Sequence, residues 1–314
     1  MRQTALNSVF ELAKIDPRIL FIGSDLGHGT LERMKTELPN QFFMEGIAEQ
    51  HIIGFAAGLA KQGFIPFVNT IATFFTRRAY EQIAIDLALH KSHVVLLASG
   101  GGMVYAPLGP THTAIEDIAL MSAIPGMKIA CPADPLEMNE VILSSIKEPG
   151  PWYIRMGKGG EPTVVDKYST KFGNVKLFGG GAEKVLLVTT GILLHTSLEL
   201  KSSDEELGSR FAILHIPILD ELESESVIRK VREADTVVIL EEHIPVGGIF
   251  TQMLHLAHKF GIDTRKLVQI SLPHVFPHNY GSQREHLAHH KLDKFGISEI
   301  LMKIIDSIEY NWKK

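Results

Sequence analysis

The sequence contains few of the features that mark secreted, membrane-spanning or nucleic-acid-binding proteins. Of its 314 residues only Cys131 is a cysteine, which excludes an intrachain disulfide framework and fits a reducing compartment. No apolar run reaches the roughly 18 residues that a membrane span needs, and residues 1–20 lack the apolar core of a signal peptide. The formal net charge is −5 without a long basic run, which gives no electrostatic reason to bind nucleic acid or an anionic membrane. We therefore expect a soluble, cytoplasmic protein.

Several local patterns are too weak to define a site. The glycine clusters SGGGMV (99–104) and FGGGA (178–182) lack the spacing of dinucleotide-binding or phosphate-binding loops, and tight turns explain them better. The 15 histidines are scattered without a matching set of cysteines or carboxylates, so we expect no metal ligands in this chain. A G-x-S-x-G nucleophile motif does not occur. Cys131 ends an apolar run, which favours the core over a nucleophilic role.

Short apolar runs alternate with segments of helical periodicity over most of the chain. Residues 18–26 and 64–70, for example, are predicted strands with a helix between them. Near-continuous apolar strands separated by helices predict parallel sheets covered on both faces. A polar, Gly-rich stretch interrupts this alternation, and the length fits about two domains. We therefore predict the α/β class, with two three-layer α/β domains of mainly parallel sheets at 1–160 and 183–314, joined by a linker at 161–182.

Two carboxylates stand in a stretch that otherwise has a buried composition. Glu45 and Glu49 lie in FFMEGIAEQHIIGFAAGLAKQGFIPFV (42–68), where a predicted helix begins. Carboxylates are rarely buried without a partner, but acids are also favoured in the first turn of a helix. The residues alone leave a structural and a functional role for Glu49 equally open.

Several motifs occur together along the chain in a specific order. They are GIAEQH (46–51), TFFTRRAYEQI (73–83), GPTHTAIEDIALM (109–121), PGMKIACPAD (125–134), YIRMGKG (153–159), VLLVTTG (185–191) and VVILEEHIPVGG (237–248). The first five resemble the pyrimidine-binding domain of the transketolase family, and the last two resemble its C-terminal domain. GIAEQH followed by GPTH is specific, although the same motifs occur in deoxyxylulose phosphate synthase and, more loosely, in the β subunit of 2-oxo acid dehydrogenases.

This resemblance implies thiamine diphosphate as the cofactor. Glu49 matches the glutamate that bonds N1′ of the aminopyrimidine and thereby favours the imino tautomer that activates the thiazolium ring. Phe74 falls where the family stacks an aromatic ring on the pyrimidine, with Phe75 as the alternative, and Tyr80 could line the same ring. Core packing remains open for these aromatic residues. Asp25 matches an acid near the cofactor at the subunit interface, and Glu45 is expected to be an ordinary paired acid.

The resemblance also implies substrate contacts. His112 in GPTH matches a histidine that faces substrate hydroxyls and relays protons, although it could also be a residue near a helix cap. Arg155 matches an arginine that grips a sugar phosphate, and Arg2 is a weaker candidate for a second such position. Two departures put the usual sugars in doubt, because Leu108 replaces a common aspartate and a channel histidine is replaced near Gly100.

In this family a separate domain with a G-D-G motif holds the diphosphate through a metal ion, and this sequence has no such motif. We therefore expect the C-terminal half of a split transketolase, a transferase that moves a two-carbon ketol unit between sugar phosphates. A partner N-terminal transketolase-type subunit would hold the diphosphate and Mg²⁺. We expect a homodimer of the isolated chain and a heterotetramer with the partner.

Three alternatives remain open at this point. The first is a synthase like deoxyxylulose phosphate synthase, which decarboxylates pyruvate. The second is a 2-oxo acid dehydrogenase β subunit, against which GPTH argues mildly. The third is a non-catalytic subunit that only completes an oligomer, against which Glu49 and His112 argue.

Overall fold

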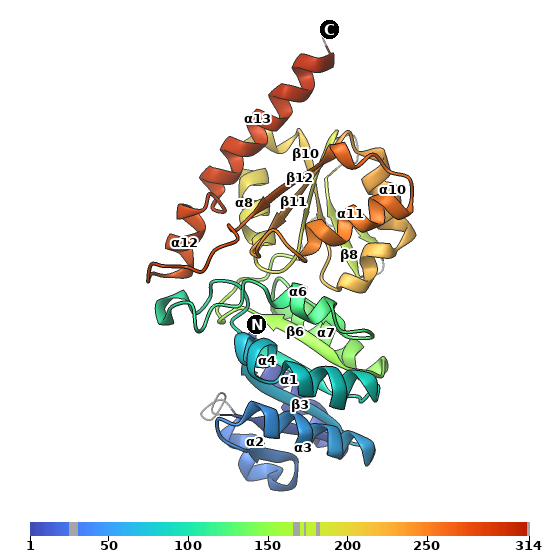
Figure 1. Cartoon of the computed structure of the whole chain (residues 1–314), viewed down its shortest axis with the longest axis vertical. Coiled ribbons are helices and arrows are strands. Elements are labelled where there is room, and N and C mark those ends of the chain that lie inside the picture. Colours follow the sequence, from blue (N-terminus) through green and yellow to red (C-terminus); the bar gives the residue numbers. More distant parts are fainter. Residues whose placement is uncertain (25–30, 166–169, 173, 180–182, 313–314) are drawn as a thin grey trace.

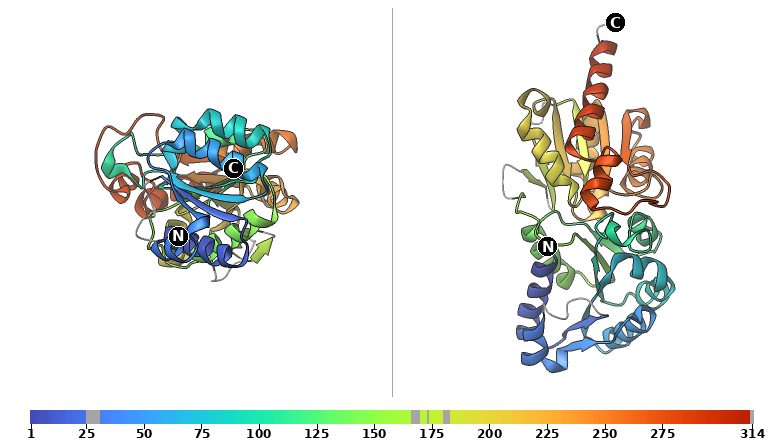
Figure 2. Two further views of the ribbon diagram at one scale, coloured as in Figure 1. Left: turned by 90° about the horizontal axis from the view of Figure 1, so that it is seen from below. Right: turned by 90° about the vertical axis from the view of Figure 1, so that its left-hand side faces the viewer.

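The structure is a computed structural model, and it describes residues 1–24, 31–165, 170–172, 174–179 and 183–312. Its elements form two α/β parts that follow one another along the longest axis (Figure 1). The side view shows the same order, with the yellow-to-red C-terminal part above the blue-to-green N-terminal part (Figure 2). We refer to them as the N-terminal part, which contains the sheet of β1 to β6, and the C-terminal part, which contains the sheet of β7 to β12.

The sheet of the N-terminal part is parallel throughout. Its strand order is β2-β1-β3-β4-β6-β5, and each neighbouring pair runs parallel. Its strands are β1 (Ile19–Gly23), β2 (Phe42–Met44), β3 (Ile65–Ile71), β4 (Val95–Ser99), β5 (Lys128–Ala130) and β6 (Trp152–Met156). One face packs against α1 (Arg2–Ile15) and α7 (Pro135–Lys147), and the other against α3 (Glu49–Lys61), α4 (Ala72–Arg78) and α6 (Asp117–Ser122). Burial on both faces explains why these strands are continuous apolar runs.

The sheet of the C-terminal part is mostly parallel, with an antiparallel edge. Its order is β12-β11-β9-β10-β8-β7, and β8 runs antiparallel to both of its neighbours. Its strands are β7 (Thr170–Phe172), β8 (Val175–Phe178), β9 (Val185–Thr189), β10 (Phe211–His215), β11 (Thr236–Glu241) and β12 (Leu267–Ser271). Helices α8 (Leu193–Ser203) and α13 (Lys294–Trp312) cover one face, and α10 (Glu225–Glu233) and α11 (Ile249–Lys259) cover the other. The two layered sheets confirm the predicted fold class.

The remaining elements are short. They are α2 (Glu32–Glu37), η1 (Pro39–Gln41), α5 (Tyr80–Gln82), the π-helix η2 (Ile83–Leu89), η3 (Ala106–Leu108), α9 (Glu205–Gly208), η4 (Leu219–Glu223), η5 (Thr264–Lys266) and α12 (Gln283–His289). Local sequence explains some of the boundaries. At α7, the carboxylate of Asp134 accepts a hydrogen bond from the Glu137 backbone N–H at 2.9 Å, and Pro135 occupies the first turn, which is a common start for a helix.

The segment between the two sheets contains more structure than its composition suggests. Strands β7 and β8 lie inside the stretch 161–182 that the sequence analysis treats as a linker, and they extend the second sheet. The glycines and charged residues of this stretch make its two short strands hard to recognise as apolar runs. The division at 160 and 183 stays a prediction, with β7 and β8 assigned to the second sheet.

The last helix, α13, projects beyond the second sheet at the end of the molecule that carries the C-terminus (Figure 1). Among the described residues, no helix combines the length and the apolar character that crossing a membrane requires. The cytoplasmic location stays a prediction from composition.

Candidate functional site

The carboxyl ends of the first sheet bring together segments that are distant in the sequence. The chain passes from β1 to β2 on one side and returns to β3 on the other, so the topology switches at β1. Ligands of open α/β sheets bind at the carboxyl ends of the strands, beside such a switch point. Glu49 follows β2, Phe74 follows β3 and His112 follows β4. These predicted residues therefore all lie at the carboxyl-end edge of the sheet.

Glu49 is the buried member of the pair of carboxylates. Its side chain is 4% exposed, and it is the first residue of α3. Nη1 of Arg78 lies 3.4 Å from each of its carboxylate oxygens. Glu45 is partly exposed and pairs with His51 across 3.2 Å, as expected for an ordinary paired acid. The buried carboxylate therefore meets its cation at the edge of the site.

Phe74 connects this ion pair to the loop that follows β4. The guanidinium carbon of Arg78 lies 3.8 Å from the centroid of the Phe74 ring. The rings of Phe74 and His112 meet at 5.4 Å with an interplanar angle of 65°. Glu49, Arg78, Phe74 and His112 therefore form one continuous cluster, which we call the carboxylate–aromatic cluster.

The other predicted aromatic residues lie against the core. The side chain of Phe75 is fully buried in the hydrophobic core that α3, α4 and the first sheet share. Tyr80 belongs to α5 and is partly buried against the same core. This placement favours Phe74 over Phe75 as the ring that faces the site, and it supports the core-packing alternative for Phe75.

Arg77 fixes the position of the loop that carries His112. It donates to Glu116 Oε1 at 2.6 Å, to the Pro110 carbonyl at 3.0 Å and to the Thr113 carbonyl at 3.2 Å. Three donors of one guanidinium therefore bind both sides of the loop. Within the loop, Nδ1 of His112 lies 2.8 Å from the hydroxyl of its neighbour Thr111. Nε2 makes no hydrogen bond within the described part of the chain.

Glycines in this region make room for tyrosines. Gly109 has a φ of +80°, and a Cβ at this position would lie 2.8 Å from the ring of Tyr280. Gly100 also has a φ of +80°, and a Cβ there would lie 2.1 Å from the ring of Tyr105. A side chain at position 100 would therefore require both backbone strain and displacement of Tyr105. Leu108 is 52% exposed directly before Gly109.

Arg2 and Asp25 are two further residues that the sequence predicts for this site. Nη1 of Arg2 is 3.5 Å from the hydroxyl of Tyr105, so Arg2 reaches the loop that follows β4 from the start of α1. Asp25 lies outside the described residues. The structure therefore brings Arg2 to the region of Gly100 and leaves the predicted role of Asp25 a prediction.

Arg155 is buried between the two parts of the molecule. Its Nε donates to Asp117 at 2.8 Å, and its Nη2 donates to the carbonyls of Glu242 at 2.9 Å and Ala114 at 3.3 Å. The Tyr153 hydroxyl donates to the same Asp117 oxygen at 2.9 Å. Burial opposes the charge on Arg155, but the carboxylate of Asp117 outweighs this and raises the pKa of the guanidinium. These contacts favour a structural role, and the predicted phosphate contact stays a prediction.

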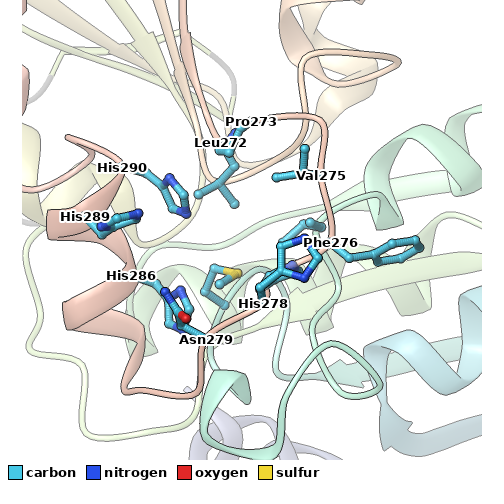
Figure 3. Close-up of a pocket in the computed structure, with 12 residues that line it drawn as sticks. Leu272, Pro273, Val275, Phe276, His278, Asn279, His286, His289 and His290 are labelled. Atoms are coloured by element: carbon cyan, nitrogen blue, oxygen red, sulfur yellow. The ribbon is translucent and has the colours of Figure 1, made fainter.

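A separate cavity of about 160 Å³ lies between the loop after β4 and the segment that follows β12. Figure 3 shows histidines of α12 on one side and Phe276 and His278 of the preceding segment on the other. Its lining contains imidazoles and apolar side chains and none of the predicted site residues. In the described part of the chain, no group of histidine, cysteine and acidic residues is arranged to hold a metal ion. The carboxylate–aromatic cluster is therefore the better candidate site.

The sequence analysis missed Arg77 and Arg78 as functional residues. Both lie in TFFTRRAYEQI, shortly after its two adjacent phenylalanines. The available signal was two adjacent cations close behind a fully buried strand, β3. Their partners come from α3 and from the loop after β4, so only the folded structure identifies what each arginine binds.

Comparison with protein families matches both parts of the chain. A family model described as "Transketolase, pyrimidine binding domain" matches residues 1–161, and one described as "Transketolase, C-terminal domain" matches residues 176–297. The chain is 28% identical to one of the subunits of apulose-4-phosphate transketolase from Phocaeicola vulgatus, over 97% of both chains. It is 30% identical to 1-deoxy-D-xylulose-5-phosphate synthase of Dictyoglomus thermophilum over 96% of this chain, but it spans only 48% of that synthase.

Solved structures of transketolases are also similar to this chain. A structure described as "Split gene transketolase, inactive beta4 tetramer" superposes with a TM-score of 0.83, at 27% identity over 97% of both chains. A transketolase mutant from Pichia stipitis superposes with a TM-score of 0.78 at 16% identity, over 97% of this chain and 46% of that one. The second likeness concerns the fold alone.

Proposed function

Because this chain belongs to the transketolase family, we propose that its carboxylate–aromatic cluster binds the pyrimidine of thiamine diphosphate in a heteromeric ketol-transferring enzyme. The observation that carries this proposal is the buried carboxylate of Glu49, which Arg78 links to the ring of Phe74 at the carboxyl ends of a parallel sheet. A buried carboxylate whose cation is a half-exposed arginine is unusual for a purely structural acid.

The residues present fit an aminopyrimidine. The planar guanidinium of Arg78 lies over Phe74 and also reaches both oxygens of Glu49, so a flat group with hydrogen-bonding edges can contact both residues at once. When bound, thiamine diphosphate supplies a thiazolium carbon nucleophile for breaking and forming carbon–carbon bonds of sugars. Glu49 would hold a proton at the pyrimidine ring nitrogen, and Phe74 would orient the ring by stacking.

His112 is the proposed proton-transfer group for the substrate. Its Nδ1 is engaged by Thr111 and its ring is held against Phe74, so Nε2 would be the nitrogen that serves the substrate. An imidazole in this position can take a proton from a substrate hydroxyl and return it. Arg77 serves as a positioning residue because it ties the histidine loop to α4.

Substrate phosphate would be bound by arginines. Arg2 is one candidate, because its contact with Tyr105 brings it to the loop after β4. Arg155 would reach a phosphate only if it left one of its contacts with Asp117 or the carbonyls. The exposed Leu108 and the Gly100–Tyr105 contact favour a sugar that differs from the usual ketose phosphates at the hydroxyls these positions would meet.

We further propose that a second, partner chain holds the diphosphate and Mg²⁺. A protein that is similar over its whole length is described as one subunit of a transketolase, and a similar structure is described as an inactive β4 tetramer of a split-gene transketolase. These descriptions favour a chain that is inactive alone. With a partner, two of each chain would complete two sites under closed symmetry.

The second candidate reaction is a pyruvate-decarboxylating synthesis. Its support is the 30% identity to the synthase of Dictyoglomus thermophilum. The 2-oxo acid dehydrogenase β subunit and the non-catalytic subunit remain weaker alternatives. Release of CO₂ from pyruvate by the reconstituted complex would favour the synthase.

The test of the proposed function is reconstitution. The chain and its candidate partner, a protein carrying the G-D-G motif, are purified separately and together, with thiamine diphosphate and Mg²⁺. We expect ketol transfer from a ketose phosphate to an aldose only when both chains are present. Robust transfer by this chain alone would refute the heteromeric proposal, and complex formation without any turnover would favour a non-catalytic subunit.

A further inference from the structure

Arg78 makes the two contacts that the proposed pyrimidine site requires of its ligand. Its guanidinium covers the Phe74 ring at 3.8 Å and lies 3.4 Å from both oxygens of Glu49. A flat cation that stacks on an aromatic ring and faces a carboxylate resembles a protonated aminopyrimidine in shape, charge and hydrogen-bonding edge.

These contacts cannot coexist with a bound pyrimidine. One face of Phe74 cannot stack on two planar groups, and both oxygens of Glu49 that would bond the pyrimidine edge already face Arg78. We propose that Arg78 is a placeholder, which occupies the pyrimidine position in the isolated chain and swings away when the cofactor binds. This inference rests on the proposed function.

The surroundings of Arg78 allow this movement. Its side chain is 50% exposed and it is the last residue of α4, so the guanidinium can rotate into solvent without disturbing the helix. The adjacent Arg77 differs, because three hydrogen bonds fix it to the histidine loop. The 3.4 Å contacts of Arg78 are long for charge-assisted hydrogen bonds, which indicates a weak hold.

The placeholder would make cofactor binding depend on the partner. A half-exposed ion pair and a cation–π contact of this kind together correspond to about a five- to tenfold change in affinity. The pyrimidine alone would have to displace Arg78 against this cost. Diphosphate contacts on the partner would offset it, so the isolated chain would keep a covered site and the complex an open one.

The experiment measures binding of a free hydroxymethyl-aminopyrimidine, the pyrimidine half of thiamine, to the full-length chain without partner. Calorimetry or ligand-observed NMR gives the affinity, and the use of the pyrimidine alone removes diphosphate and metal from the comparison. Arg78→Gln is expected to bind about five- to tenfold more tightly than the unchanged chain. Arg78→Lys retains the charge without the planar fork and should fall between them. Circular dichroism checks that each variant is folded.

Two further variants make the result specific. Arg265→Gln removes an exposed arginine that pairs with Asp263 in the C-terminal part, and it should bind like the unchanged chain. Glu49→Gln should weaken binding both alone and together with Arg78→Gln. Equal, weaker or undetectable binding by folded Arg78→Gln overturns the placeholder, whereas loss of binding in Glu49→Gln would still support the pyrimidine site. If Glu49→Gln leaves the affinity unchanged, the pyrimidine site fails and the placeholder fails with it.

Discussion

The ring of Phe74, in the helix after β3, meets the ring of His112, in the loop after β4, edge to face at 5.4 Å. An aromatic residue proposed to bind the cofactor therefore supports the histidine proposed to serve the substrate. Such edge-to-face pairs contribute about 0.5–1.5 kcal/mol beyond their buried area. Because of this contact, we expect a substitution of Phe74 to change the position of His112 as well.

Glu49→Gln tests the proposed acid–base role of Glu49. In the reconstituted complex we expect normal assembly and a turnover at least about a hundredfold lower, the scale of losing an acid–base group. Glutamine retains the size of the side chain and removes its acid–base function. Steady-state rates and calorimetric cofactor binding check this result. Glu45→Gln is the matched control, and an unchanged rate in Glu49→Gln with bound cofactor would identify the wrong carboxylate.

Arg77→Gln tests the support of the histidine loop. The variant loses the bonds to the Pro110 and Thr113 carbonyls, so His112 should lose its fixed orientation. We expect kcat to fall about tenfold or more, with little change in the affinity for thiamine diphosphate, because misplacement of a catalytic group lowers the rate steeply. Arg33→Gln, an exposed arginine paired with Glu37 on α2, is the control. A fall in cofactor affinity of the same size as the fall in kcat would contradict a role limited to His112.

The sequence could predict the layers of this fold because both faces of the first sheet are buried, which makes β1, β3 and β4 plain apolar runs. It could not identify β7 and β8, because these two short strands lie in a polar, Gly-rich segment. β7 has three residues and β8 has four, which is too few for a recognisable hydrophobic pattern.

The candidate site divides in the same way. Glu49 and His112 could be named as candidates because they belong to motifs that occur in a specific order, and their roles stay predictions. Arg78 could not, because its role depends on two contacts made across the fold with Glu49 and Phe74. The environment of Arg155 was also hidden, since Asp117 and the Glu242 carbonyl come from other segments.

Arg155→Met separates the structural role of this arginine from its predicted role in phosphate binding. The change leaves the fully buried Asp117 without its cation, and breaking a buried pair typically costs about 3–5 kcal/mol. We expect a loss of this order in the free energy of unfolding of the isolated chain, measured with denaturant. Arg265→Met removes an exposed pair and should have little effect. An unchanged stability together with a raised KM for phosphorylated sugars would instead restore the phosphate contact.

Glu137 links the two parts of the molecule and should make stability depend on pH. It is 1% exposed, pairs with Lys176 of β8 and lies 2.8 Å from His215 Nε2 of β10. Burial raises its pKa, but His215 and Lys176 outweigh this and lower it from 4.5 to about 2. Because the folded pKa lies below the unfolded one, this stabilisation is present above about pH 4.5 and is lost as the pH falls toward about 2.

Denaturant unfolding across this pH range checks whether the stability falls as the pH falls. Glu137→Gln should be less stable at neutral pH, by about 3–5 kcal/mol, and its stability should fall less steeply with acid than that of the unchanged chain. Glu32→Gln alters an exposed carboxylate of α2 and should keep the original slope. Parallel acid curves for Glu137→Gln and the unchanged chain would contradict this assignment.

The last prediction concerns assembly. Large apolar side chains are exposed on both parts of the chain, including Ile47 at 67%, shortly before α3, and Phe276 at 66%, in the segment after β12. Apolar surface of this kind is commonly buried by association. We expect the isolated chain to form a homodimer, packed through both of its parts, and an α₂β₂ heterotetramer with its partner, since closed symmetry then completes two sites.

Light scattering at micromolar concentration measures both states. Ile47→Ser and Phe276→Ser should each shift the isolated chain toward monomer, while Ile15→Ser, at an exposed apolar residue at the end of α1, serves as the control. A homotetramer of the isolated chain would agree with the β4 description of the similar structure and correct only the stoichiometry. A strictly monomeric chain that forms an active one-to-one heterodimer would contradict the assembly prediction and leave the proposed roles of Glu49 and His112 untouched.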